Sequence, residues 1–187
     1  MVWLGAVPAL PGEHGAAHVD AVLLAALDGD GVVADFVCTH VDRVGPVSVT
    51  TLSAHVPGDV DVARLSGALD GPVVVLGDSP DSPDSPDSAA ARAARAARDR
   101  ADGRCVRFPG QAALTGTHPV AHVVAESAID RVVGIGVPVS PADPVETLGF
   151  LRPVCRDGEL VLYVEPAVGG VLRPAEAESP HECCGGH

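Results

Sequence analysis

The sequence predicts an α/β fold: a single domain built on a mixed β-sheet of about six strands with three to four helices. Val-rich runs alternate with amphipathic helical segments through the middle of the chain. Two pairs of neighbouring β-rich runs are joined by short turns, which predicts hairpins and therefore a mixed sheet. Hydrophobic residues make up 47% of the 187 residues and aromatic residues only 3%, so the core must be aliphatic.

In the first half of the chain, each predicted element is an apolar pattern that ends at turn residues. These elements are strands at 2–7, 32–41, 47–56 and 72–76, and helices at 14–27 and 61–69. The strands at 32–41 and 47–56 form a predicted hairpin. The continuous apolar run at 72–76 predicts a strand that is buried on both faces.

Residues 78–88 repeat Asp-Ser-Pro. Proline at every third position excludes a helix, so this segment is expected to be an exposed loop. Ser88 is well placed to cap an Ala/Arg helix over 89–101.

The second half of the chain shows the same kinds of pattern. We expect a strand at 105–108, a helix at 120–133 capped by Thr117, a strand at 133–139 and a C-terminal β-hairpin at 152–164. The hairpin turns on Arg156-Asp157-Gly158. The domain is expected to cover residues 1–174, followed by a flexible tail at 175–187.

Charge and composition exclude several classes of function. The net charge of −13 opposes binding to nucleic acid. All 12 basic residues are arginine, a bias typical of a GC-rich genome. No apolar run is long enough for a membrane span. The five cysteines do not form the pattern of a disulfide framework, so a reducing cytoplasm is the expected compartment.

The C-terminal tail carries the densest set of metal-binding side chains. His181, Cys183, Cys184 and His187 lie within seven residues, and two glycines let the segment bend. Thiolate and imidazole are the ligands that Zn²⁺ and Cu(I) prefer. Adjacent cysteines rarely both reach one tetrahedral ion without strain. We therefore expect either that Cys155 or a histidine of the domain shares the metal, or that the tail is a loose arm that captures metal ions. The leading hypothesis is a non-catalytic protein that binds zinc or copper.

Two other groups of side chains suggest different sites. His118 and His122 have helical i,i+4 spacing with Glu126 one turn further on, an arrangement that would suit a metal-dependent hydrolase. His14 and His18 repeat the spacing. A third group lies on one strand, where Cys38 and His40 share a face.

Several short segments between residues 47 and 135 resemble the STAS domains of anti-sigma-factor antagonists. They are Gly-Asp-Val-Asp-Val-Ala at 58–63, Pro-Val-Val-Val-Leu at 72–76, Asp-Ser-Ala-Ala at 87–90 and the segments 104–108 and 119–135. The resemblance implies a regulatory module that binds a protein partner and is switched by phosphorylation at Ser88. The sequence leaves the oligomeric state open.

Overall fold

The structure is a computed structural model that describes residues 2–9, 16–77 and 87–178. Within these residues it is a mixed α/β protein with four α-helices and one eleven-stranded sheet. The first half contains β1 (Val2–Ala6), α1 (Ala16–Gly29), β2 (Phe36–Asp42), β3 (Val49–Val56), α2 (Val62–Leu69), β4 (Val73–Gly77), α3 (Ala89–Arg98) and β5 (Arg104–Arg107).

The second half contains most of the short strands. Its elements are a 3₁₀ turn (Gln111–Ala113), β6 (Thr117–Pro119), α4 (Val120–Ala125), β7 (Arg131–Gly134), β8 (Pro144–Glu146), β9 (Val154–Arg156), β10 (Glu159–Pro166) and β11 (Leu172–Pro174). The predicted mixed α/β class and number of helices are confirmed, but the prediction of about six strands is wrong. Three of the additional strands, β6, β8 and β11, have three residues each, too few to show an alternating pattern.

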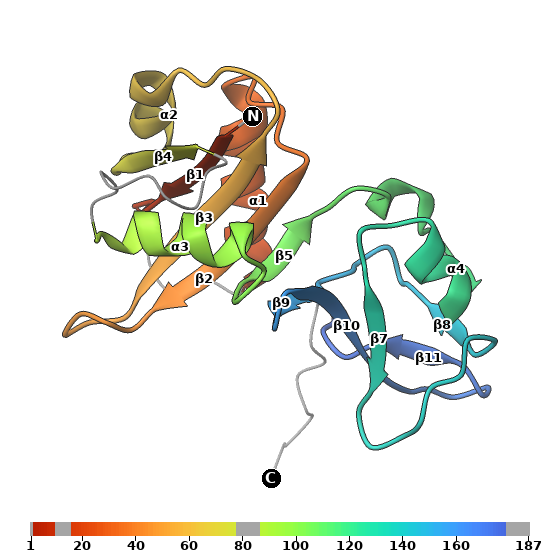
Figure 1. The fold of residues 1–187 in the computed structure, drawn as a ribbon. Helices are drawn as coiled ribbons and strands as arrows, with labels where there is room; N and C mark the ends of the chain where they lie inside the picture. The colour runs from red at the N-terminus through yellow and green to blue at the C-terminus, as the bar shows by residue number, and fades with distance from the viewer. Residues whose placement is uncertain (1, 10–15, 78–86, 179–187) are drawn as a thin grey trace, which may run out of the picture.

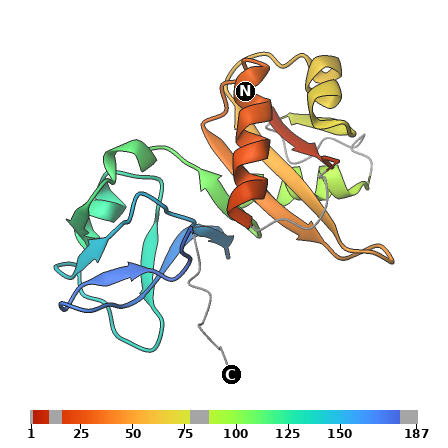
Figure 2. The ribbon, with the colours of Figure 1, turned by 180° about the vertical axis from the view of Figure 1, so that it is seen from behind.

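The strands lie in the order β4-β1-β3-β2-β5-β9-β10-β11-β8-β6, with β7 pairing beside β10. The first four strands are antiparallel, and their order and connections form a split βαβ arrangement. Figures 1 and 2 show two lobes, with β5 leading from the first lobe to the second. The predicted hairpins β2–β3 and β9–β10 are both confirmed.

Helices cover both faces of the first lobe. α1 and α2 pack on one face through Leu23, Leu27 and Leu65, and α3 lies on the other face, as Figures 1 and 2 show from opposite sides. α3 packs closely because its buried residues are all alanine. A Cβ on Gly5 of β1 would lie 1.9 Å from the carbonyl oxygen of Ala90, so glycine is required beneath the helix.

Two of the predicted elements are corrected. β4 is an edge strand that pairs with β1, and Val75 is 38% exposed, so the strand is not buried on both faces. The helix predicted for 120–133 ends at Ala125. The Ser127 hydroxyl bonds to the Val123 carbonyl and accepts the Ile129 N–H, which competes with helical hydrogen bonds.

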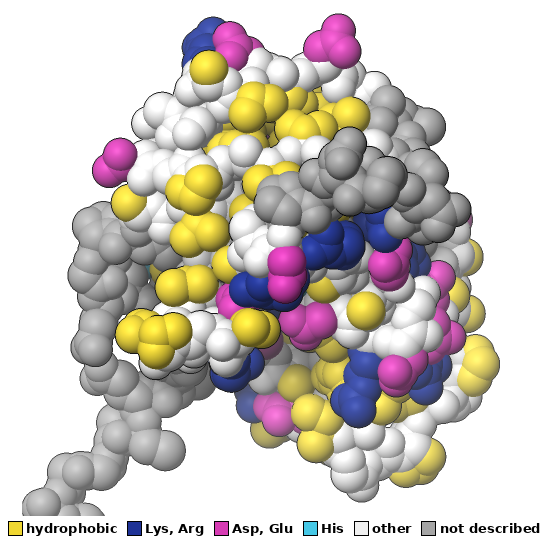
Figure 3. Space-filling model, turned by 60° about the vertical axis from the view of Figure 1, so that its left-hand side comes forward, with side chains coloured by type: hydrophobic (Ala, Val, Ile, Leu, Met, Phe, Trp, Pro, Cys, Tyr) yellow, Lys and Arg dark blue, Asp and Glu magenta, His cyan; other side chains and the backbone are white. Residues whose placement is uncertain are grey.

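Charged side chains are interleaved on the surface. On the face shown in Figure 3, basic side chains lie beside acidic ones. Neighbouring side chains of opposite charge form ion pairs in the structure, among them Arg92–Asp42, Arg98–Asp99 and Arg107–Asp28.

Candidate functional site

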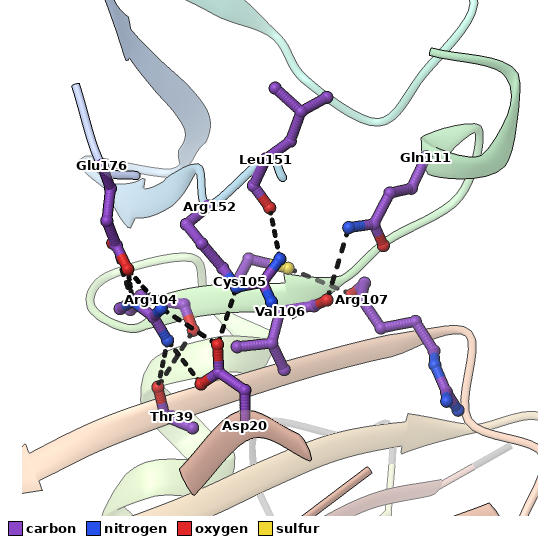
Figure 4. Close-up of polar contacts among 10 residues, drawn as sticks. All are labelled: Asp20, Thr39, Arg104, Cys105, Val106, Arg107, Gln111, Leu151, Arg152 and Glu176. Carbon is purple, nitrogen blue, oxygen red and sulfur yellow. Dashed lines mark hydrogen bonds and ion pairs between the residues drawn. The ribbon is translucent and has the colours of Figure 1, made fainter. Parts of the chain in front are cut away.

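A buried carboxylate joins the two lobes. Asp20 of α1 is 2% exposed and accepts hydrogen bonds from Arg104 at 2.6 and 3.0 Å and from Arg152 at 2.8 Å. Arg104 lies on β5, and Arg152 lies just before β9, so residues from three parts of the chain meet here (Figure 4). A buried carboxylate is tolerated because two guanidinium groups balance its charge.

Arg104 also binds the first part of the C-terminal tail, residues 175–187. Its Nε–H donates to both carboxylate oxygens of Glu176 at 2.8 Å (Figure 4). Burial opposes the charge of Arg104, but the hydrogen bonds to Glu176 and Asp20 outweigh burial and raise the pKa of the guanidinium. Glu176, near the start of the tail, is therefore held against β5.

Arg104 and Asp20 also line a pocket of about 420 Å³. Thr39, His40, Asp102 and Gly103 contribute polar and backbone surface to it, and aliphatic side chains complete its wall. A concave, mostly apolar site with a few converging polar groups is the usual form of a ligand site. This pocket is the strongest candidate site in the part of the chain that the structure describes.

His40 is the most unusual side chain of the pocket. Its Nε2 lies 2.7 Å from the Ser53 hydroxyl. Its Nδ1 is buried without a hydrogen-bond partner and lies 3.7 Å from an oxygen of Asp102, which is longer than a hydrogen bond. Burial lowers the pKa of His40, although the Asp102 charge acts in the opposite direction, so the imidazole is neutral near pH 7.

Gly103 covers the ring of His40. Its φ of +131° and its position, where a Cβ would lie 2.6 Å from His40 Cε1, both require glycine. Glycine at position 103 therefore lets the loop between α3 and β5 pass close to the His40 ring, with Asp102 beside it.

The contacts from Ser53 to His40 and from His40 to Asp102 have the spatial order of a Ser-His-Asp catalytic triad. The burial and the distances of these side chains do not fit such a triad. Ser53 is fully buried, so a substrate carbonyl cannot reach its hydroxyl. The acid is too far from the imidazole to orient it by a hydrogen bond. Ser53 is better understood as the group that fixes the orientation of the His40 ring.

Three cysteines that are distant in sequence meet in the core. Cys38 and Cys105 are register partners on β2 and β5, and the sulfur of Cys38 lies 3.9 Å from that of Cys155. Burial is the main cause of the raised pKa of Cys38. The pKa of Cys155 is lowered, first by the hydrogen bond from Cys38 and also by Arg100. Cys155 is 3% exposed, so its thiol packs inside the protein.

The ligands predicted in the tail, His181, Cys183, Cys184 and His187, lie outside the described residues. Between residues 2 and 178, apart from 10–15 and 78–86, no three His, Cys, Asp or Glu side chains are grouped so that they could hold a metal ion.

The alternative histidine pair is close in space, but not on one helix. His118 lies in β6 and His122 in α4, and their rings stack at 4.8 Å. His118 Nε2 donates to the Thr115 carbonyl at 2.8 Å. Glu126 is exposed at the end of α4. The turn from strand to helix, rather than helical spacing, brings the rings together.

Ser88 caps α3, as the sequence predicts. Its hydroxyl accepts the Ala91 N–H at 3.2 Å. Arg92 pairs with the neighbouring Asp87 at 3.0 Å, and Arg95 lies 3.7 Å from the same carboxylate. Ser88 thus lies at a helix N-terminus with two guanidinium groups nearby.

No protein-family model, curated protein or solved structure matches this chain. Function is therefore argued from the site alone. None of the helices within residues 16–77 and 87–178 is long and apolar enough to cross a membrane.

Proposed function

We propose that this protein binds a transition metal, zinc or copper, through the side chains of its C-terminal His-x-Cys-Cys-x-x-His segment, without catalysing a reaction. The chemistry of the ligands motivates the proposal, because thiolate and imidazole together suit both metals. A reducing cytoplasm is the proposed compartment, since it would keep the thiols available for a metal.

The observation that supports this function best is the bond between Glu176 and Arg104. Glu176 precedes His181 by five positions and is fixed to the wall of the pocket of about 420 Å³. A segment anchored at this point would start beside the pocket, which raises the effective concentration of its ligands there. Without this bond, the ligands of the segment would not be concentrated beside the pocket.

Metal analysis of the purified full chain tests the proposal. The full chain, prepared without a chelator, should contain about one zinc or copper ion, and a variant that ends at Pro180 should contain none. A variant with both His118→Ala and His122→Ala serves as the matched control and should keep its metal. Metal that is lost from this control but kept by the shortened chain would overturn the proposal and support the alternative histidine site.

The position of Ser88 favours a second candidate, a STAS-like regulatory module with a protein partner. A phosphate on this residue would lie at the N-terminus of α3 beside Arg92 and Arg95, where both the helix dipole and the guanidinium groups favour negative charge. After incubation with a lysate of the source cells and ATP, the intact mass should rise by one phosphoryl group. Ser88→Ala should abolish the rise, and an unmodified wild-type chain would count against this candidate.

A further inference from the structure

We propose that a second pocket, lined by Trp3, Phe36 and His55, binds a small neutral ligand with one aromatic ring and a hydroxyl group, as in phenol. Its volume is about 180 Å³, and it shares no side chain with the pocket beside Asp20. The inference goes beyond the proposed function and does not depend on it, because the side chains that form this pocket are not among the proposed metal ligands.

Three ring-bearing side chains lie in one row across the sheet. β3 lies between β1 and β2 (Figure 1), and His55 on β3 is the register partner of both Trp3 on β1 and Phe36 on β2. The ring centroids of Trp3 and His55 are 5.0 Å apart, and those of Trp3 and Phe36 are 5.9 Å apart in an edge-to-face arrangement. The row brings together the only Trp and one of the three Phe of the chain, and so supplies aromatic surface for a ligand ring.

A carboxylate fixes the orientation of the His55 ring. His55 Nδ1 lies 2.6 Å from Oδ1 of Asp35, and the Asp35 N–H donates to the His55 carbonyl at 3.2 Å. Because a carboxylate only accepts, Nδ1 carries the proton in this bond, and Nε2 of the neutral imidazole keeps its lone pair. Among the residues that the structure describes, none forms a hydrogen bond with Nε2. The His55 side chain is 19% exposed, so Nε2 is available as an acceptor for a ligand.

The charges around the pocket favour a neutral ligand. Arg100 also lines the pocket, but its charge is balanced by Asp130, and its guanidinium lies 5.8 Å from the centroid of the Phe36 ring. Beside a neutral His55, the Asp35 carboxylate keeps its negative charge. An anionic ligand would be repelled by this carboxylate at short range, whereas a neutral hydroxyl group can donate to His55 Nε2.

The size and position of the pocket suit a single ring. A protein cavity of roughly 150 Å³ can hold benzene. A volume of about 180 Å³ therefore has room for one six-membered ring with a small substituent. Pro109 and Ala128, which follow β5 in the chain, complete the wall. The pocket thus lies where the two lobes meet, a common position for ligand sites.

Together these features define one mode of binding. The ligand ring would pack against Trp3 and Phe36 in the offset or edge-to-face arrangement that aromatic pairs prefer. Its hydroxyl group would donate to His55 Nε2. The aromatic ring, the hydroxyl proton and the absence of charge each contribute, and each can be removed separately from the ligand.

The test is an NMR titration of the full-length, isotope-labelled chain with phenol. Because Trp3 is the only tryptophan, the spectrum contains a single indole N–H signal, which reports on the pocket. The comparison ligands are anisole, which lacks the hydroxyl proton, cyclohexanol, which lacks the aromatic ring, and benzoate, which is negatively charged. The variant is His55→Leu. His122→Leu is the matched control, because His122 is exposed and lies outside the pocket.

Phenol should shift the Trp3 signal saturably, with a Kd on the order of 1 mM for a ligand of this size. Each comparison ligand should bind about fivefold more weakly. His55→Leu should weaken phenol binding by a similar factor and remove the preference for phenol over anisole, whereas His122→Leu should do neither.

The inference is overturned if the Trp3 signal does not saturate, or if phenol binds no better than anisole or cyclohexanol. It is also overturned if His55→Leu binds phenol as tightly as His122→Leu. If His55→Leu does not fold, the comparison of phenol with anisole on the wild type decides. Failure here would leave the proposed function standing, because metal content is measured independently of phenol binding.

Discussion

Arg104 and Asp20 are joined by two hydrogen bonds of 2.6 and 3.0 Å, and this pair connects the first helix to the strand that leads into the second lobe. Removing one partner of a buried ion pair leaves the other charge uncompensated and costs about 3–5 kcal/mol. Asp20→Asn should therefore lower the free energy of unfolding by several kcal/mol in urea denaturation. The control is Asp28→Asn, whose carboxylate pairs with Arg107 on the surface and should cost less than about 1 kcal/mol. Equal losses in the two variants would show that the Asp20 pair has no special role.

Gly5→Ala should destabilise the first lobe. The added methyl group would lie 1.9 Å from a backbone oxygen of α3, so the helix would have to move. Overpacking of this kind costs about 1–3 kcal/mol. Gly58→Ala is the control, since a Cβ there meets no atom within 4 Å. The midpoint of thermal unfolding should fall clearly only in the Gly5 variant.

The stability of the metal-free protein should depend on His40 as the pH falls. The folded-state pKa of His40 lies below its ordinary value of 6.5, so the unfolded chain binds the proton more readily. The contribution of His40 to stability is complete above pH 6.5 and is lost as the pH falls through the folded-state pKa. Denaturation curves of the wild type and His40→Gln should therefore converge toward acid pH. A difference that stayed constant across this range would contradict the assignment.

The thiols of the core should react slowly. Cys38 and Cys105 are fully buried and Cys155 is 3% exposed. A variant with Cys183→Ser and Cys184→Ser should therefore react with a thiol reagent at the rate of unfolding, and rapidly only in denaturant. Rapid reaction of this variant without denaturant would show that the core opens locally.

The anchor of the tail can be tested separately from its ligands. Glu176→Gln should weaken the affinity for Zn²⁺ several-fold while leaving the stoichiometry unchanged, because the segment loses its fixed starting point but keeps its ligands. Glu178→Gln is the matched control, since this neighbouring acid is exposed. An equal effect of the two variants would show that only the negative charge matters.

Elements that a short sequence motif specifies, such as a capping residue or a turn, could be predicted from the sequence. Ser88 caps α3 as expected, and the turn at Asp157-Gly158 connects β9 and β10 with positive φ at both residues. The short strand β6 could not be predicted, because three residues become a strand only when β8 pairs with them. The helix α4 ends early because the Ser127 side chain forms hydrogen bonds to the backbone of Val123 and Ile129. The helix propensities of the residues do not reveal these bonds.

The candidate site was less predictable than the fold. The sequence directs attention to His40 through its neighbour Cys38, but Asp102 lies in a segment rich in charged residues where nothing distinguishes it. Asp20 occupies a buried position of α1, and a carboxylate at such a position indicates a cationic partner elsewhere. The identity of that partner, Arg104, depends on how β5 lies beside α1, which is a property of the tertiary structure.

The connection between the lobes has a mechanical consequence. β5 and β9 share the single register pair Arg104–Val154, supported by backbone hydrogen bonds from Cys105 to Pro153 and from Cys155 to Gly103. Each lobe, by contrast, is held together by longer strand pairs. If the molecule were pulled apart by force, β5 and β9 would resist through few backbone hydrogen bonds, so the buried core around Cys38, Cys105 and Cys155 would have to carry much of the load between the lobes. The ion pairs of Asp20 with Arg104 and Arg152 would then add to the force that is needed to separate the two lobes.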